Sequence, residues 1–309
     1  MRNAFADEMT RLGAEDTRVV LLSGDIGNKL FDKFKERAEA RFLNCGVAEG
    51  NMMSVAAGMA LSGMRPFVYT ITPFTTTRCF EQIRVDACYH HAPVTIVGTG
   101  SGLSYAELGP THHSLEDLAI LRTLPGMTVF APCDEVELRC GLRAALNQAG
   151  PVYIRIGKKG EPIIHKNPPD FSFGRAITVR EGAEACILAA GTIMPEALAA
   201  AELLSKSGVS TRVESFHTIK PLDTAKLAEA FGSFALVAVV EEHGLIGGLG
   251  SAVAEWRAAQ DGKIARMLSF GTPDQFMHEV GPQEYARRKF GLTADNIASR
   301  MLGALHRVA

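Results

Sequence analysis

The stretch RPFVYTITPFTTTRCFEQIRVDACYHHAPVTIVGTG at residues 65–100 decides the fold of the first half of the chain. It begins with a β-rich run at 65–72 and ends with a second one at 93–100, and a helical pattern at 80–89 lies between them. Largely apolar strands that are separated by a helix are typical of a parallel sheet covered on both faces. This unit therefore predicts an α/β fold.

The same alternation extends outward from this unit. Further strands are predicted at 19–25, 128–132 and 151–156, and a helix at 51–61. The segment EPIIHKNPPDFSF at 161–173 then interrupts the pattern, because it holds three prolines and little periodicity. Such a segment is typical of a linker.

The alternation restarts after this interruption. Strands are predicted at 185–191, 210–219, 235–243 and 265–271, and helices at 195–207, 223–231 and 249–260. We therefore expect two α/β domains, each with a mostly parallel sheet flanked by helices. The first spans residues 1–162, the linker spans 163–174, and the second domain spans 175–309.

Composition excludes several classes of protein. The 309 residues are 47% hydrophobic and 21% charged, which is ordinary for a globular chain and unlike a disordered one. A net charge of −2 without a Lys/Arg cluster argues against nucleic acid as a partner. No apolar run reaches the roughly 18–20 residues that span a bilayer, so we expect no membrane segment.

Cysteine usage and the N-terminal residues indicate a compartment. The six cysteines include no CxxC pair, and we interpret them as reduced thiols. The opening MRNAFADEMTRLG carries acidic residues and lacks the apolar region of a signal peptide. We therefore expect a cytoplasmic protein.

Two segments carry charged side chains at the ends of predicted strands. SGDIGNKL at 23–30 places Asp25 where α/β folds hold ligands, although Asp25 could equally cap a helix. VYIRIGKKG at 152–160 places Arg155 at the end of a strand, followed by two lysines. That segment is either a solvated basic loop or a clamp for a phosphate, sulfonate or carboxylate.

A third segment, NCGVAEGNMMSVAAGMAL at 44–61, predicts a buried helix that is apolar on most sides. Glu49 lies at its N-terminal edge. The helix dipole favours a carboxylate there by about 0.3–1 kcal/mol, which is a structural explanation for the residue. The functional alternative is a buried carboxylate that exchanges a proton with a ligand.

The fourth segment, ELGPTHHSLEDLAILR at 107–122, holds a candidate catalytic histidine. His112 and His113 precede an amphipathic helix, and adjacent histidines point in different directions. No HExxH or similar ligand spacing accompanies them, so we expect no metal site in this chain. Imidazole is suited to acid/base work near neutral pH.

Absent motifs narrow the function further. The sequence contains no GxGxxG that opens a βα unit, no GxxxxGK[ST] and no GxSxG. A nicotinamide site, a P-loop and a hydrolase nucleophile elbow therefore have no support.

Three blocks in the right order closely resemble the C-terminal half of transketolase and of 1-deoxy-D-xylulose-5-phosphate synthase, two enzymes that use thiamine diphosphate. The blocks are GVAEGNMMSVAAGMA, GPTHHSLEDLAILRTLPGMTVFAPCDE and EEHGLIGGLGSAVAE. The resemblance covers nearly the whole chain. It implies a pyrimidine-binding domain followed by the transketolase C-terminal domain.

The resemblance implies roles for residues that would contact the cofactor. Glu49 matches the glutamate that hydrogen-bonds N1′ of the cofactor's aminopyrimidine, where a held proton activates the cofactor. Phe74 matches the aromatic residue that stacks on the pyrimidine, and Phe80 is the alternative stacking residue or a core aromatic. Asp25 matches a position near the cofactor that is reached across a subunit interface.

The resemblance also implies roles toward the substrate. His112 matches the histidine near the substrate hydroxyls, a candidate for proton transfer. Arg155 matches the arginine that grips the anionic end of the substrate, and Lys29 is expected to assist it. Leu108 stands where two-domain relatives carry an aspartate that reads sugar configuration, so the usual sugar-phosphate specificity is in doubt. Ser101 replaces an arginine of the synthase, which weakens the deoxyxylulose-phosphate assignment.

The chain lacks the block that binds the diphosphate and Mg²⁺ in these enzymes. That block is a G-D-G…N motif in an N-terminal domain, and no GDG occurs here. The resemblance therefore implies a split transketolase that moves a two-carbon ketol unit from a ketose to an aldose. A separate N-terminal subunit would supply the diphosphate and Mg²⁺ ligands, and the expected assembly is an α2β2 heterotetramer.

Two alternatives remain open from the sequence. The same cofactor could serve a subunit that acts on pyruvate or another 2-oxo acid, like the synthase or the β-type chain of a dehydrogenase E1. The chain could also be a noncatalytic subunit that kept the fold, although a scaffold has no physical need for both Glu49 and His112.

Overall fold

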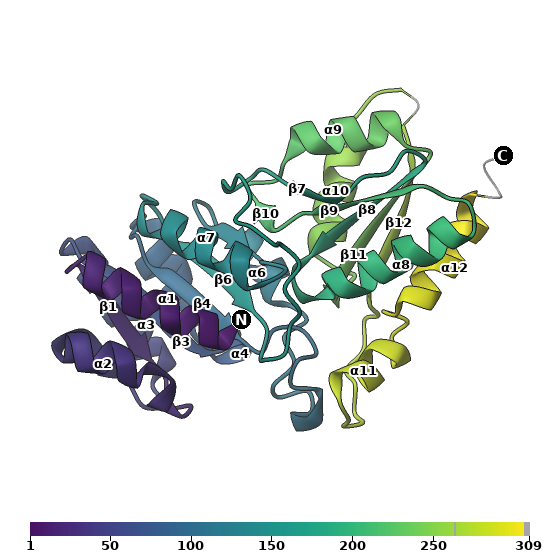
Figure 1. The fold of residues 1–309 in the computed structure, drawn as a ribbon. Coiled ribbons are helices and arrows are strands. Elements are labelled where there is room, and N and C mark those ends of the chain that lie inside the picture. Colours follow the sequence, from purple (N-terminus) through teal and green to yellow (C-terminus); the bar gives the residue numbers. More distant parts are fainter. Residues whose placement is uncertain (263, 306–309) are drawn as a thin grey trace.

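The computed structural model describes residues 1–262 and 264–305 and contains two α/β units (Figure 1). In this described part, one unit is built on a seven-stranded sheet and the other on a five-stranded sheet. Most neighbouring strands run parallel. The α/β class with mostly parallel, helix-flanked sheets is therefore confirmed.

The first sheet has the strand order β10-β5-β6-β4-β3-β1-β2. Its strands are β1 (Val19–Ser23), β2 (Phe42–Asn44), β3 (Arg65–Ile71), β4 (Thr95–Thr99), β5 (Thr128–Phe130), β6 (Val152–Ile156) and β10 (Thr218–Lys220). Successive side chains of a strand point to opposite faces, so Leu21 packs on one side of the sheet and Leu22 on the other. Both faces consequently need helices.

Helices cover both faces of this sheet (Figure 1). One side carries α1 (Arg2–Glu15), α2 (Asp32–Ala38) and α7 (Glu135–Leu146); the other carries α3 (Glu49–Leu61), the π-helix η4 (Ile83–Tyr89) and α6 (Asp117–Arg122). Met52 and Met53 of α3 are buried, as its apolar pattern predicts, whereas Val55 and Leu61 stay exposed. The helix is therefore buried on one side only.

The second sheet has the order β12-β11-β8-β9-β7. Its strands are β7 (Ile177–Arg180), β8 (Ala185–Ala190), β9 (Thr211–Ser215), β11 (Leu236–Gly244) and β12 (Arg266–Thr272). One face carries α8 (Met194–Lys206) and α12 (Ala294–Leu305), and the other carries α9 (Thr224–Ser233) and α10 (Leu249–Ala258). The short helix α11 (Gln283–Lys289) follows β12 in the chain. The buried cluster beneath α3 continues into α9 and α10, so the two units share apolar packing.

The single strand expected at 210–219 is wrong, because this run divides between the two sheets. Its first part, β9, pairs in parallel with β8, while β10 pairs antiparallel with β5 at the edge of the first sheet. Phe216 and His217 are buried where the chain crosses from one sheet to the other. By covering the edge of β5, this crossing protects a strand edge that would otherwise be open to pairing.

Two further observations concern the lengths of the helices and the state of the cysteines. Across residues 1–262 and 264–305, no helix combines the length and the apolar character that crossing a bilayer requires. All six cysteines are free thiols.

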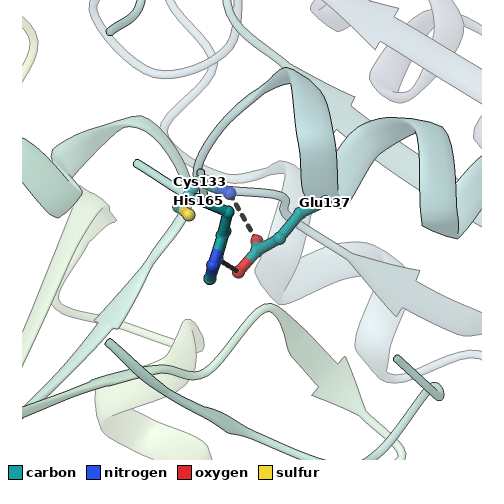
Figure 2. Close-up of side chains that lie close together, drawn as sticks. All are labelled: Cys133, Glu137 and His165. Carbon is teal, nitrogen blue, oxygen red and sulfur yellow. Dashed lines mark hydrogen bonds and ion pairs between the residues drawn. The ribbon is translucent and has the colours of Figure 1, made fainter. Parts of the chain in front are cut away.

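A buried ion pair fastens the connecting segment to the first unit (Figure 2). Asp134 caps α7 with one carboxylate oxygen and accepts the backbone N–H groups of Ile164 and His165 with the other. Glu137 lies 2.9 Å from Nε2 of His165 and accepts the N–H of Cys133. Because both oxygens of Glu137 are engaged, we interpret this Cys, Glu and His group as a structural junction.

The titration of this junction predicts how stability depends on pH. Burial is the largest single influence and opposes the charge of both groups, but their mutual hydrogen bond together with the surrounding charges and hydrogen bonds outweighs it: the pKa of His165 is raised and the pKa of Glu137 is lowered. Because its pKa is raised in the folded state, His165 stabilises the fold below about pH 6.5. This stabilisation is lost as pH rises through the folded pKa. The carboxylate contributes above about pH 4.5 and loses its effect as pH falls through its lowered pKa.

We therefore expect His165→Gln to cost about 1–3 kcal/mol of unfolding free energy near pH 5.5, because a charged hydrogen bond is lost. The deficit should shrink above neutral pH. Urea unfolding across this pH range measures it, and His278→Gln, a change at an exposed histidine, is the control. A deficit that grows with rising pH would contradict the assignment.

Candidate active site

Glu49 is a buried carboxylate at the first residue of α3. Its side chain is 4% exposed, and the positive end of the helix dipole lies beside it. Its partner is Arg78, whose Nη1 donates to Oε2 at 2.9 Å. Arg78 belongs to the short 3-10 helix η3 (Thr77–Cys79) and is 48% exposed. The sequence prediction of a buried acid at this helix start agrees with its position.

The structure separates the two aromatic candidates. Phe74 lies in α4 (Thr72–Thr75), directly after β3, and its ring centroid is 4.1 Å from the guanidinium carbon of Arg78. Phe80, which begins the short helix α5 (Phe80–Gln82), packs against the apolar cluster beneath α3. Phe74 therefore shares a neighbour with Glu49, whereas Phe80 takes the role of a core aromatic.

His112 joins the same group of side chains. Its ring centroid lies 5.5 Å from that of Phe74 and 6.1 Å from that of Tyr105. Thr111 Oγ1 and His112 Nδ1 form a 2.9 Å hydrogen bond. The neighbouring His113 is buried instead, and burial lowers its pKa. The two adjacent histidines thus point into different surroundings, as expected.

Lys158 extends the group, and sequence reasoning did not select it. Its Nζ lies 4.6 Å from the centroid of the Tyr105 ring and forms an ion pair with Glu107. Together with Lys159 it lines a groove against residues 280–284 of the second unit. The sequence shows a basic loop here, and the structure adds a contact with Tyr105 that connects Lys158 to His112.

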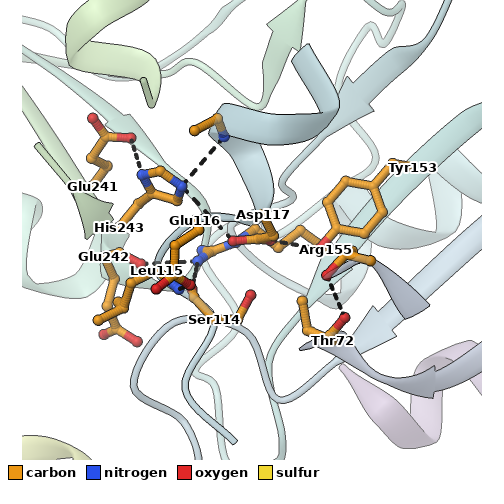
Figure 3. A network of polar contacts seen from close by, with 12 residues as sticks. Thr72, Ser114, Leu115, Glu116, Asp117, Tyr153, Arg155, Glu241, Glu242 and His243 are labelled. Atoms are coloured by element: carbon orange, nitrogen blue, oxygen red, sulfur yellow. Dashed lines mark hydrogen bonds and ion pairs between the residues drawn. The ribbon is translucent and has the colours of Figure 1, made fainter. Parts of the chain in front are cut away.

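Arg155 does not occupy the position expected of a substrate clamp. It is 2% exposed on β6, an interior strand of the first sheet, and its Nε donates to Asp117 at 2.7 Å (Figure 3). Its Nη2 donates to the carbonyl oxygens of Ser114 and of Glu242 on β11. The expectation that Arg155 grips the substrate is therefore corrected: its guanidinium is used in joining the two units.

Asp25 and Lys29 lie at the edge of the first sheet. Asp25 follows β1, is exposed, and accepts a 3.3 Å hydrogen bond from Asn44. Its N–H donates to Gly46, which starts the loop leading to Glu49. Lys29 is exposed in the short 3-10 helix η1 (Asn28–Phe31). Within the described residues, no recorded contact connects Asp25 or Lys29 to His112.

Comparison with known proteins identifies the chain. Residues 1–161 match the family described as "Transketolase, pyrimidine binding domain", and residues 174–297 match "Transketolase, C-terminal domain". The chain belongs to the transketolase family.

Similar transketolase chains come as separate subunits. The chain is 36% identical to the 6-deoxy-6-sulfo-D-fructose transketolase subunit of Clostridium sp. (strain MSTE9), with 96% of this chain and 92% of that one covered. It is also 36% identical to an apulose-4-phosphate transketolase subunit of Phocaeicola vulgatus, with 97% and 96% covered.

A solved structure described as a split-gene transketolase in an inactive β4 tetramer is also similar. It superimposes with a TM-score of 0.90 at 35% identity, and the match covers 99% of this chain and 98% of that one. The activity of this type of transketolase chain is thus thiamine-diphosphate-dependent ketol transfer. Such a chain acts as a subunit that needs a separate partner.

The residues fit the pyrimidine end of thiamine diphosphate. A buried carboxylate and an aromatic face, both in contact with one flat nitrogen cation, suit a planar aminopyrimidine that donates a hydrogen bond. Mg²⁺ prefers oxygen ligands in octahedral geometry. Among the described residues, the recorded group of three candidate metal ligands includes a thiol, and burial together with the nearby carboxylates raises the pKa of that Cys133 thiol. These residues of the transketolase chain therefore fit the cofactor's pyrimidine, whereas the group that contains Cys133 does not suit Mg²⁺.

Proposed function

We propose that this chain is the pyrimidine-binding subunit of a two-subunit transketolase that takes a two-carbon ketol unit from an anionic ketose. One observation carries this proposal: a continuous line of contacts runs from Glu49 through Phe74 and His112 to Lys158, by way of Arg78 and Tyr105. It brings a proton-holding carboxylate, a stacking ring, an imidazole and an ammonium group into one site.

Each group has a distinct task in this proposal. Bound thiamine diphosphate supplies an electron sink for the ketol unit. Glu49 holds a proton at N1′ of the aminopyrimidine, and Phe74 stacks on that ring. His112 exchanges a proton with the substrate hydroxyls. Lys158 holds the anionic end of the sugar in place of Arg155, because the ammonium group of Lys158 is partly exposed and can leave Glu107.

The partner subunit supplies the remaining ligands in this proposal. The sequence has no G-D-G…N block, so the diphosphate and Mg²⁺ sites belong to the partner, in an α2β2 assembly. An exposed apolar side chain beside the site supports a covering chain. Val47, two residues before Glu49, is 81% exposed. Large exposed apolar side chains are typical of interaction surfaces where they cluster.

Both relatives mentioned above are named for a sugar that carries a sulfonate or a phosphate. This supports an anionic donor. It also favours ketol transfer over the alternative of a subunit that acts on pyruvate. We therefore propose a ketose sulfonate or ketose phosphate as the donor class.

Co-purification and reconstitution test this function. The chain is purified from its source cells, and the partner that comes with it is sequenced and produced separately. We expect a partner with a GDG…N block, and ketol transfer only when both chains, thiamine diphosphate and Mg²⁺ are mixed. Release of CO₂ from pyruvate without ketol transfer would favour the 2-oxo acid alternative. A reconstituted complex without either activity would favour a noncatalytic subunit.

A substitution at Lys158 tests the anion site. Lys158→Met should raise KM for an anionic ketose about tenfold or more, because a hydrogen-bonded charge pair is lost. The kcat should change little. Lys159→Met, a change at the adjacent exposed lysine, is the matched control. Steady-state kinetics with a charged ketose and its uncharged counterpart measure the effect. An equal loss with both sugars would contradict this role.

A further inference from the structure

Arg78 bridges two residues that are assigned to the same ring of the cofactor. Its Nη1 donates to Glu49 Oε2 at 2.9 Å, and its guanidinium carbon lies 4.1 Å from the centroid of the Phe74 ring. One side chain therefore makes a hydrogen bond with the carboxylate and stacks on the aromatic face. Nothing in the resemblance or in the family matches assigns a role to this arginine.

The chemistry of the guanidinium explains why it suits both contacts. It is a flat, delocalised nitrogen cation that donates in its plane and stacks through its faces. An aminopyrimidine with a proton at N1′ has the same properties, since it donates an N–H in its plane and stacks through the ring. The contacts of Arg78 are therefore of the two kinds that the aminopyrimidine needs, so the two groups compete where they use the same oxygen of Glu49 and the same face of the Phe74 ring.

The burial of Glu49 explains why its carboxylate needs the contact with Arg78. The carboxylate is 4% exposed, and removing the partner of a buried charge is costly. Arg78 is 48% exposed and comes from a short 3-10 helix, so its long side chain has space to move toward solvent. The pair thus combines a fixed carboxylate with a displaceable cation.

We propose that Arg78 is a displaceable stand-in for the aminopyrimidine of thiamine diphosphate. It neutralises Glu49 and covers Phe74 until the cofactor takes both contacts. This inference rests on the proposed function, because it assumes that the pyrimidine binds at Glu49. Its consequence is that the subunit binds the cofactor against an internal competitor, so that stable loading requires the diphosphate contacts of the partner.

Binding measurements on the reconstituted complex and on the full chain alone test this competition. The probe is thiamine diphosphate with Mg²⁺, followed by titration calorimetry. Arg78→Met removes the charge and keeps an unbranched side chain. If the displaced conformation is populated at about one part in ten, this variant should bind about tenfold more tightly. Thermal unfolding without cofactor should occur at a lower temperature, because Glu49 loses its partner.

Two further variants keep the test specific. Arg84→Met makes the same charge change at a nearby exposed ion pair with Glu81, and its Kd should equal that of the unchanged protein. Arg78→Lys keeps the charge without a flat stacking group, so its Kd should fall between those of the unchanged protein and Arg78→Met. This variant also protects the test if Arg78→Met fails to fold.

The outcomes separate this inference from the proposed function. An unchanged complex that binds no thiamine diphosphate would refute the proposed function itself. If that complex binds the cofactor and Arg78→Met binds it equally well, the competition is refuted while the function stands. Weaker binding by Arg78→Met would also refute the competition, because it would make Arg78 a contact that helps to hold the cofactor.

Discussion

Replacing Glu49 by glutamine should reduce the kcat of the reconstituted transketolase by about 10²–10⁴-fold. The amide cannot hold and exchange the proton that the carboxylate shares with N1′ of the aminopyrimidine. The side chain keeps its size, so α3 and its packing on the first sheet should stay unchanged. Ketol transfer at saturating substrate and cofactor measures the effect.

Glu81→Gln is the matched control for this change. Glu81 lies in α5, is exposed, and pairs with Arg84 rather than with a residue of the site. We expect the control to keep full turnover, and both variants to assemble with the partner. Undiminished turnover in Glu49→Gln would refute the assigned role of the carboxylate.

Replacing Arg155 by methionine should lower the free energy of unfolding by about 3–5 kcal/mol, because a buried ion pair loses one member. Arg155 and Asp117 are both almost fully buried. Burial alone would raise the pKa of Asp117, but the nearby charges, led by that of Arg155, and the hydrogen bonds from Arg155 and Tyr153 together hold that pKa below its ordinary value. The carbonyl oxygens of Ser114 and Glu242 would also lose the hydrogen bonds that Arg155 donates to them.

Urea unfolding measures this loss, and kinetics distinguish it from a role in binding. A second variant, Arg155→Met with Asp117→Asn, should recover part of the stability, because the unpaired carboxylate is removed as well. In contrast, unchanged stability combined with a higher KM for anionic sugars would return Arg155 to the role of substrate clamp. Lys158→Met should behave in the opposite way, with a higher KM and unchanged stability.

Local patterns in the sequence were enough for part of the site. Glu49 could be chosen because the start of an apolar helix is a position that can be read from neighbouring residues. The polar loop before a helix indicates a candidate histidine, and the family resemblance selects His112 rather than the adjacent His113. Local patterns do not separate Phe74 from Phe80, because both follow the same strand, and only the family resemblance favours Phe74. Their different surroundings arise from the direction of the chain through α4 and η3.

Arg155 and Lys158 show where local reading failed. The two residues are three positions apart at the end of one strand, and both carry a positive charge. Which one lies beside the site depends on Asp117, which is 38 residues away in sequence and neutralises Arg155 inside the protein. Nothing within the strand itself reveals that partner.

The sequence by itself determined the α/β class, the family and the segments that carry Glu49 and His112, because these depend on periodicity and short motifs. Only the tertiary structure decided that Arg78 pairs with Glu49, that Lys158 rather than Arg155 lies beside Tyr105, and that the run at 210–219 serves two sheets. The physical reason is the same in each case: charge pairing and strand pairing join residues that are distant in sequence, and the energy of such contacts depends on their environment in the folded chain.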